Sequence, residues 1–135
     1  MRLARKAEKT DLEALGRVEE DAFADKRRRR SIALSVSEGL CWIMFDGKKE
    51  AGFLTIDSLS VSECHIGLIA VHSCCKKRGI ASFLLKYVLQ EYSGRTFYGT
   101  TTRDNKAMIK VFTKCGFKAA GKPDDGRGEL VFARK

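Results

Sequence analysis

The chain has 135 residues, of which 44% are hydrophobic and 32% are charged. This length and composition exclude a disordered chain and predict one globular domain, residues 1–135, with its own core. No apolar run reaches the roughly 18 residues of a membrane span and no signal-peptide core is present, so we expect a soluble, cytoplasmic protein without a membrane partner.

The formal net charge of +9 has two interpretations. Charge runs most often form a solvated surface that keeps a protein soluble, and we prefer this interpretation. The alternative is a partner with negative charge, such as an acidic peptide, a nucleic acid or a ribosome surface.

Five cysteines in a chain with no secretory signal indicate reduced thiols. Cys41, Cys64 and Cys115 lie in apolar contexts and are expected to be small core residues. The spacing of Cys74 and Cys75 does not match that of metal ligands, so no metal site is expected.

The N-terminal segment predicts one short strand and two helices. Weak alternation over residues 2–6 indicates the strand. Thr10 and Glu13 have the spacing of a capping box, so a helix is expected to follow, its buried side formed by Leu12, Leu15, Ala22 and Phe23. Residues 25–38 predict a second helix that ends at Gly39, its inward face formed by Ile32, Ala33 and Val36.

A run of cations, residues 26–30, stands at the start of the second predicted helix. Cations near a helix N-terminus oppose the helix dipole, so something other than helix stability would keep them there. Alternatively, the helix begins later and the run is an exposed loop.

A hairpin and a buried strand follow. Residues 40–45 and 51–59 predict two strands joined by the turn signal Asp46-Gly47. Residues 66–71 form a nearly continuous apolar run, which is typical of a strand buried on both faces.

The next segment has the pattern of a phosphate cradle. Residues 72–79 are polar, basic and turn-like, and a helical apolar face follows, formed by Ile80, Ala81, Leu84, Leu85, Val88, Leu89 and Tyr92. In a strand–loop–helix, backbone N–H groups and a helix N-terminus converge on an anion. Gly79 leaves room for a ligand to approach, and Lys76, Lys77 and Arg78 stand at the rim.

The C-terminal part predicts a strand, a helix and a closing hairpin. Residues 96–102 are β-branched and aromatic, as in a strand. Asp104 can cap a helix that ends at Gly116, its inward face formed by Ala107, Met108, Val111, Phe112 and Cys115. Residues 117–120 and 129–133 indicate two strands, joined by a turn at residues 123–126.

Two motifs resemble the GNAT N-acetyltransferases. Val71-His72-Ser73-Cys74-Cys75-Lys76-Lys77-Arg78-Gly79-Ile80-Ala81 is similar to that family's acyl-CoA loop, with Lys76 at the Arg/Gln position, Gly79 at the first Gly and Ala81 at the Gly/Ala position. Residues 105–117 resemble its Asn-x-x-Ala-x-x-x-Tyr-x-x-x-Gly-Phe stretch, with Phe112 in place of Tyr. The order of the predicted elements also matches.

The resemblance implies an α/β fold, in which a mixed, mostly antiparallel sheet of about 6–7 strands is flanked by about 4 helices. It implies acetyl-CoA as the cosubstrate, with the pantetheine arm between two splayed strands. The cofactor-binding residues would be Ile69, Ala70, Val71, Lys76, Lys77, Arg78, Gly79, Ile80, Ala81, Ser82, Asn105, Ala107 and Phe112. For Asn105, helix capping is the competing interpretation.

Catalysis is less well defined by the resemblance. The family commonly uses the motif Tyr to protonate the leaving thiolate, and Phe112 has no proton to give. Tyr98 or a water could substitute for the motif Tyr. A thiol with a pKa of ~8.5 also departs reasonably well as a thiolate without an acid to protonate it.

His65 is the candidate base, with Glu63 as a second candidate. We expect His65 to share a strand face with Gly67, Ile69 and Val71. A half-buried strand His without a catalytic role is the alternative, and His72 is expected to be exposed or to cap the loop.

The predicted function is acetyl transfer from acetyl-CoA to a primary amine, by direct attack in a ternary complex. The acceptor could be a small molecule, a polyamine or a protein N-terminus, and the Arg27–Arg30 run would suit an acidic acceptor only if it faces the cleft. A non-catalytic acyl-CoA-binding module is the main alternative, because of Phe112. A basic nucleic-acid-binding or ribosome-binding domain is a less favoured alternative, because the aromatic residues are not interleaved with the cations.

A homodimer through the last strands is possible.

Overall fold

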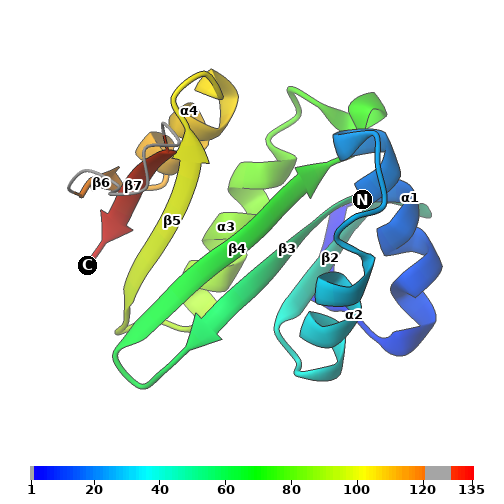
Figure 1. The fold of residues 1–135 in the computed structure, drawn as a ribbon, viewed down its shortest axis with the longest axis horizontal. Helices are drawn as coiled ribbons and strands as arrows, with labels where there is room; N and C mark the ends of the chain where they lie inside the picture. Colours follow the sequence, from blue (N-terminus) through cyan, green and yellow to red (C-terminus); the bar gives the residue numbers. More distant parts are fainter. Residues whose placement is uncertain (1, 121–128) are drawn as a thin grey trace.

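The apolar runs of the sequence assemble into a single mixed sheet in the computed structural model, which describes residues 2–120 and 129–135. Within these residues the sheet has seven strands, in the order β1-β2-β3-β4-β5-β7-β6 (Figure 1). Neighbouring strands are antiparallel except for β4 and β5, which are parallel. The strands are β1 (Arg2–Lys6), β2 (Cys41–Asp46), β3 (Lys49–Leu59), β4 (Glu63–Val71), β5 (Thr96–Thr102), β6 (Lys118–Ala119) and β7 (Glu129–Arg134).

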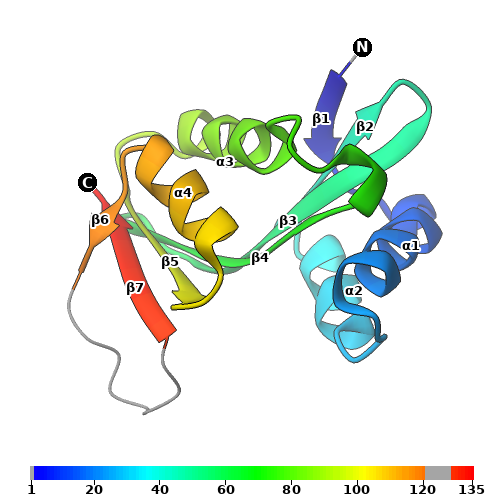
Figure 2. The same cartoon turned by 90° about the horizontal axis from the view of Figure 1, so that it is seen from above.

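The helices lie on both faces of the sheet (Figure 2). One face carries α1 (Leu12–Phe23) and α2 (Arg29–Ser37), and the other carries α3 (Ile80–Glu91) and α4 (Lys106–Lys114). Two 3-10 turns, η1 (Lys9–Asp11) and η2 (Ser73–Cys75), precede α1 and α3. The predicted α/β fold with a mostly antiparallel sheet is confirmed. No helix in the described part of the chain is long and apolar enough to cross a membrane.

Each face of the sheet has its own hydrophobic core. Trp42, Leu84, Phe97 and Phe112 belong to the cluster beneath α3 and α4. Leu15, Val18 and Phe53 belong to the cluster beneath α1 and α2. Cys41, Cys64 and Cys115 are buried, as expected. Burial raises the pKa of the Cys41 thiol to about 12 and that of Cys64 to about 11, so these thiols stay protonated.

The start of α1 differs from the prediction. Thr10 lies inside η1, and the carboxylate that accepts the backbone N–H belongs to Asp11, which bonds Glu8 N at 2.7 Å. The Arg5 guanidinium binds both Asp11 oxygens, at 2.7 and 2.9 Å. This pairing lowers the pKa of Asp11 and fixes the turn before Leu12. A capping box formed by Glu8 and Asp11, with Asp11 held by Arg5, therefore replaces the predicted box of Thr10 and Glu13.

The second helix begins at Arg29, four residues later than predicted, because the arginine run is held by acids. Glu19 is fully buried in α1, and its oxygens accept from Arg28 N and Arg29 Nε, both at 2.7 Å. Asp25 pairs with Arg27 and with Arg28, at 3.2 and 3.0 Å. The run thus joins α1 to α2. This role explains why cations stand near the N-terminus of α2 although they oppose its dipole.

We expect Glu19→Ala to lower the free energy of unfolding by about 2–4 kcal/mol, because it removes the partner of Arg29 and the acceptor of the Arg28 N–H from a buried position. Glu20→Ala is the matched control, since the Glu20 side chain is 56% exposed; we expect a change within about 0.5 kcal/mol. Urea denaturation of both variants measures the difference. Equal losses for the two would contradict a structural role for Glu19.

A β-bulge interrupts β4 beside Thr55 of β3. The register shifts between Leu54 and Ile56, and Leu68 N bonds Thr55 Oγ1 at 2.9 Å. An extra residue at a bulge reverses the alternation of side chains. Cys64 and Ile66 before the bulge, and Ile69 and Val71 after it, therefore all pack on the α3 side.

This bulge corrects the prediction for His65. His65 alternates with Cys64 and Ile66, so its side chain lies on the opposite face of the sheet. It does not share a face with Ile69 and Val71. The prediction assumed uninterrupted alternation along the strand.

The cap of α4 also differs from the prediction. Asn105, not Asp104, is the N-cap residue, and its Oδ1 accepts from Met108 N at 3.1 Å. Ala107 is exposed instead of facing inward. The closing strands are present as β6 and β7, and the predicted turn at residues 123–126 lies outside the described residues.

Candidate active site

Strands β4 and β5 are paired at one end only. Their register runs from Glu63 with Thr96 to His65 with Tyr98, and beyond this rung the strands diverge, as Figure 1 shows. We call the opening between them the splay. On the other edge of β4, His72 N–H donates to Ala51 O of β3 at 2.8 Å. Because alternate residues direct their backbone groups to opposite edges, Val71 and Ile69 direct theirs into the splay.

The loop from β4 to α3 opens at the wide end of the splay. Lys77 and Gly79 have φ values of +65° and +76°, in the left-handed region. No side chain among the described residues caps α3, so the N–H groups of its first turn, from Ile80 to Ser82, remain available. Lys76, Lys77, Arg78 and Gly79 are exposed at this rim, Ile80 and Ser82 are buried and Ala81 is half-buried. We call this arrangement the cradle, because an uncapped helix N-terminus behind a basic loop has the geometry that suits an anion.

The cradle loop is tied to α1. Both oxygens of Asp21 accept from Ser73, one from its backbone N–H at 2.6 Å and one from its hydroxyl at 2.8 Å. These hydrogen bonds lower the pKa of Asp21. The His72 ring accepts from Cys74 N at 3.3 Å, which confirms the predicted capping role. The start of the loop is therefore held in place from the opposite face of the sheet.

His65 and Tyr98 come together at the closed end of the splay. Their rings stack with centroids 4.8 Å apart, and His65 Nε2 lies 3.0 Å from Glu63 Oε1. The His65 side chain is 42% exposed and Tyr98 is half-buried. A carboxylate partner orients the imidazole, and both rings are close enough to solvent to exchange protons.

The second motif forms the far wall of the splay. Asn105 stands at the start of α4, directly after β5. Phe112 is buried, stacked on Phe132 and tilted against Phe117, with centroids 5.3 and 5.0 Å away. A Cβ on Gly99 of β5 would come within 2.5 Å of its Cζ, so the ring tip faces the strand. Phe112 therefore supports β5 from behind.

A group of residues that the motifs did not indicate lies beside the β4 bulge. A cavity of about 280 Å³ is enclosed by α2, β3 and the bulge, and Asp57 and Glu38 contribute its carboxylates. Asp57 is an acid that directly follows the largely apolar residues 51–56 of β3, and this was the signal that the sequence offered. The other walls come from segments far apart in the chain, so the pocket could not be read from one motif.

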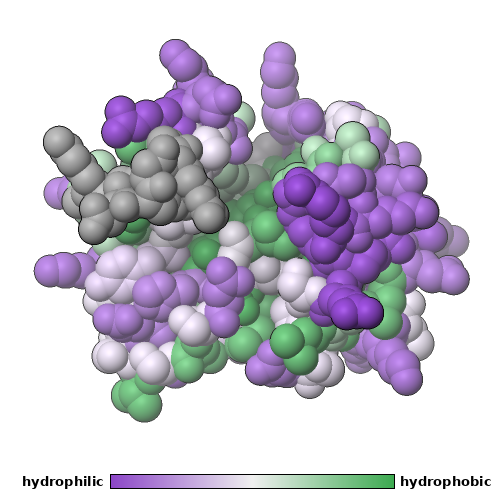
Figure 3. All heavy atoms as spheres, in the orientation of Figure 1, coloured by the Kyte–Doolittle hydropathy of each residue, from purple (hydrophilic) through white to green (hydrophobic). Residues whose placement is uncertain are grey.

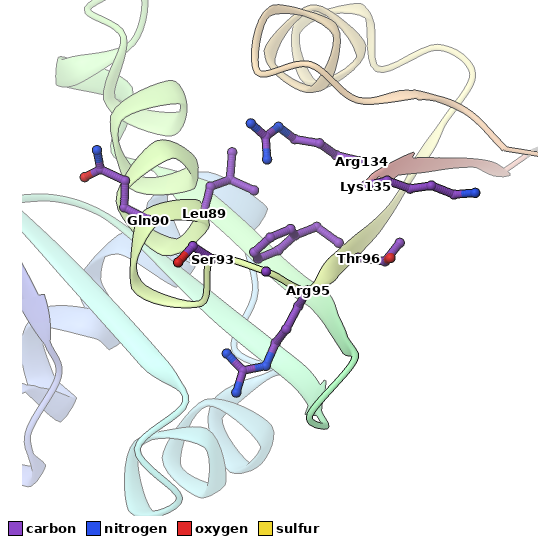
Figure 4. A pocket seen from close by; sticks show the side chains of 9 residues that line it. Leu89, Gln90, Ser93, Arg95, Thr96, Arg134 and Lys135 are labelled. Atoms are coloured by element: carbon purple, nitrogen blue, oxygen red, sulfur yellow. The ribbon is translucent and has the colours of Figure 1, made fainter.

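A larger cavity, about 610 Å³, lies elsewhere. It is found where α3 ends and β5 begins, among Leu89, Arg95, Arg134 and Lys135 (Figure 4). Arg95 bonds Ser60 O at 2.7 Å and lies over the Tyr92 ring. This cavity is at the opposite end of β5 from the cradle, so size alone does not mark the site.

Comparison with known proteins identifies the fold and the motifs. The model of the acetyltransferase (GNAT) family matches residues 4–117. A GNAT-family acetyltransferase from Bacillus cereus is 32% identical, with a TM-score of 0.89 over 100% of this chain and 97% of that chain. The ribosomal-protein-S18-alanine N-acetyltransferase from Escherichia coli is 24% identical, with a TM-score of 0.84 over 98% of this chain and 92% of that one.

A more distant structure is similar in fold. It is the PaiA N-acetyltransferase from Thermoplasma acidophilum in complex with coenzyme A, which is 14% identical, with a TM-score of 0.82 over 100% of this chain and 99% of that one. A search of curated proteins gave no match. The family model covers most of the sequence and includes both motifs, so this chain belongs to the acetyltransferase (GNAT) family.

Proposed function

We propose that this protein is an acetyl-CoA-dependent N-acetyltransferase that transfers the acetyl group to a primary amine by direct attack in a ternary complex. The observation that carries the proposal is the splay of β4 from β5, with an uncapped helix N-terminus at its wide end. A thioester arm can lie along the free edge of β4 while its diphosphate binds the cradle.

The cosubstrate would contact three parts of the chain. The backbone groups of Ile69 and Val71, on either side of Ala70, would bond the pantetheine arm like an added strand. The diphosphate would accept from backbone N–H groups between Lys76 and Ser82, with charge from the cations at the rim. The amide of Asn105 and the exposed Ala107 would face the same arm from α4, and Phe112 would support that wall.

The chain's own groups can meet the needs of the transfer. A backbone N–H on the edge of β4 that faces the splay can polarise the thioester carbonyl. An amine with a pKa of ~10.4 is mostly protonated at pH 7, so a base must take its proton, and His65 fits that role because Glu63 orients its ring. Tyr98, stacked on His65, can protonate the leaving thiolate in place of the missing motif Tyr.

The test is calorimetric titration with acetyl-CoA, followed by measurement of thiol release in the presence of a panel of amines. Binding together with amine-dependent thiol release supports the transferase. Binding without release for any amine would instead support the non-catalytic acyl-CoA-binding module. Absence of binding would reject both.

We expect Asp21→Ala to raise the Kd for acetyl-CoA about 3–10-fold, because the cradle loop loses two hydrogen bonds. The pKa of Asp21 is lowered, so its contribution is complete above the ordinary carboxyl pKa and is lost only as pH falls through the lowered value. The rise should therefore be the same from pH 6 to pH 8. Calorimetry with Glu20→Ala as the control measures it, and an unchanged Kd would show that the cradle is rigid without Asp21.

A further inference from the structure

Two neighbouring cysteines in the cradle loop have no role in the function proposed above. Cys74 and Cys75 lie in the 3-10 turn η2, and their Sγ atoms are 3.2 Å apart. Both are free thiols. Sulfur atoms at this distance are in contact but not bonded, since the bond of a disulfide measures about 2.05 Å. The turn therefore holds a pair of thiols that are close enough to react with each other.

The two thiols differ in their access to solvent. Cys74 is exposed, whereas Cys75 is buried and belongs to the hydrophobic cluster beneath α3 and α4. Burial raises the pKa of the Cys75 thiol, which keeps this thiol protonated. The loop that carries the pair stands at the top of the view in Figure 1, and Figure 3 shows hydrophilic side chains projecting from the surface there. An oxidant in solution therefore meets Cys74 first.

The other three cysteines are shielded from such an oxidant. Cys41 and Cys64 are fully buried in the sheet, and Cys115 is buried at the end of α4. The Cys115 thiol faces the carbonyl oxygen of Ser82, at 4.0 Å, and not another sulfur. Cys75 is thus the thiol with which an oxidised Cys74 can react.

We propose that Cys74 and Cys75 form a peroxide-sensitive modification site, at which oxidation closes a disulfide and displaces the cradle. The Cys74 sulfur attacks one oxygen of hydrogen peroxide, the O–O bond breaks, one water leaves and Cys74 becomes a sulfenic acid. The Cys75 sulfur then forms the S–S bond, and the sulfenic oxygen leaves as a second water. The two thiols lose two electrons and two protons, and the peroxide is reduced to water. A thiol reductant reverses the reaction by exchange and is itself oxidised to a disulfide.

Closing this bond has to change the backbone of the turn. The Cα atoms of adjacent residues are about 3.8 Å apart, below the roughly 4.4–6.8 Å usual for a disulfide, so the new ring is strained. In the reduced turn, Cys75 N–H donates to His72 O at 2.8 Å and Cys74 N–H donates to the His72 ring at 3.3 Å. Both donors belong to the ring that the disulfide closes, so we expect both hydrogen bonds to break. Strained disulfides are also reduced readily, which makes the modification reversible.

The displacement passes toward the cradle. Ser73, before the pair, is held by both oxygens of Asp21, at 2.6 and 2.8 Å, so this end stays fixed. After the pair, Lys76 N–H donates to Ser73 O over a long 3.5 Å, and Lys77 has a φ of +65° in the left-handed region. This end is the more weakly held and moves first. Gly79 and the N–H groups of α3 follow directly, so oxidation should weaken acetyl-CoA binding. That consequence rests on the proposed function, whereas the disulfide itself does not.

Mass spectrometry tests the disulfide. The reduced protein is treated briefly with hydrogen peroxide, its remaining thiols are alkylated, and its peptides are mapped. We expect two of the five cysteines to escape alkylation, namely Cys74 and Cys75 joined to each other. In Cys75→Ala, the exposed thiol should stop at the sulfenic acid, which dimedone traps, and the wild type should not accumulate this adduct. Absence of a disulfide in the wild type, or a disulfide from Cys74 to another cysteine, would overturn the proposal.

Calorimetric titration with acetyl-CoA, before and after peroxide, measures the effect on the cradle. We expect the Kd of the wild type to rise about tenfold on oxidation, because the turn loses hydrogen bonds, and to return on reduction with dithiothreitol. Cys74→Ser, at an exposed position, is the matched control, and peroxide should leave its Kd unchanged. The same rise in Cys74→Ser, or an oxidised wild type that binds as tightly as the reduced protein, would overturn the coupling of the pair to the cradle.

A measurement without ligand separates this inference from the proposed function. The backbone amide NMR signals of Lys76 and Gly79 should shift on oxidation of the wild type, and peroxide should not shift them in Cys74→Ser. If the reduced protein fails to bind acetyl-CoA but forms the disulfide and shows these shifts, the transferase is rejected and the modification site stands. If the reduced protein binds acetyl-CoA and peroxide forms no disulfide, the modification site is rejected and the transferase stands.

Discussion

Gly79→Val should weaken acetyl-CoA binding at least about 100-fold, which corresponds to about 2.7 kcal/mol. Gly79 precedes the first turn of α3 with φ at +76°, a conformation that a β-branched residue adopts only under strain. If the backbone relaxes, the first N–H groups of α3 turn away from the diphosphate. If it does not relax, the new side chain stands where the diphosphate approaches. Both outcomes remove the cradle.

Gly94→Val is the control for backbone strain alone. Gly94 also has a positive φ, +90°, and no atom lies within 4 Å of the position of its Cβ. It follows α3 at the end opposite to the cradle, so this variant should lose stability to a similar degree and bind acetyl-CoA normally. Calorimetry gives the Kd and thermal unfolding gives the stability of each. If Gly79→Val binds as tightly as Gly94→Val, the diphosphate is held elsewhere.

The features of the fold that the sequence predicts well are those with a local cause. The apolar run of β4, the turn-like cations and the apolar face of α3 each follow from side-chain period. Gly79 could be read as the cradle glycine because its neighbours in the chain are also its neighbours in space. The resemblance to the family added the prediction that two strands splay around the pantetheine arm, which periodicity alone cannot supply.

The features that the sequence missed depend on pairing across the fold. Nothing near Gly67 in the chain shows that Thr55 will accept the Leu68 N–H, yet this bond accompanies the bulge that changes the face of His65. The start of α2 depends on Glu19, which is one helix away. The cavity beside the β4 bulge is missed for the same reason, because its walls come from α2, β3 and β4.

Phe112→Ala should lower the free energy of unfolding by about 3–5 kcal/mol, because the ring is 2% exposed and contacts two other buried aromatic rings. For a chain of this size the loss corresponds to a fall in Tm of about 10–20 °C. Phe83→Ala on α3 is the matched control. Its ring is 38% exposed, so its loss should stay below about 1 kcal/mol. Similar losses for the two would show that Phe112 is not a core residue.

The variant Phe112→Tyr tests whether the hydroxyl that the motif lacks can be restored. The ring tip faces Gly99 so closely that the new hydroxyl would press on β5. We expect a loss of about 1–3 kcal/mol and no gain in kcat. A kcat at least tenfold higher, without loss of stability, would mean that the ring turns toward the splay and that Phe112 limits the wild-type enzyme.

If kcat does not rise, protonation of the thiolate depends on another group. Tyr98→Phe should then lower kcat while leaving the Kd for acetyl-CoA unchanged.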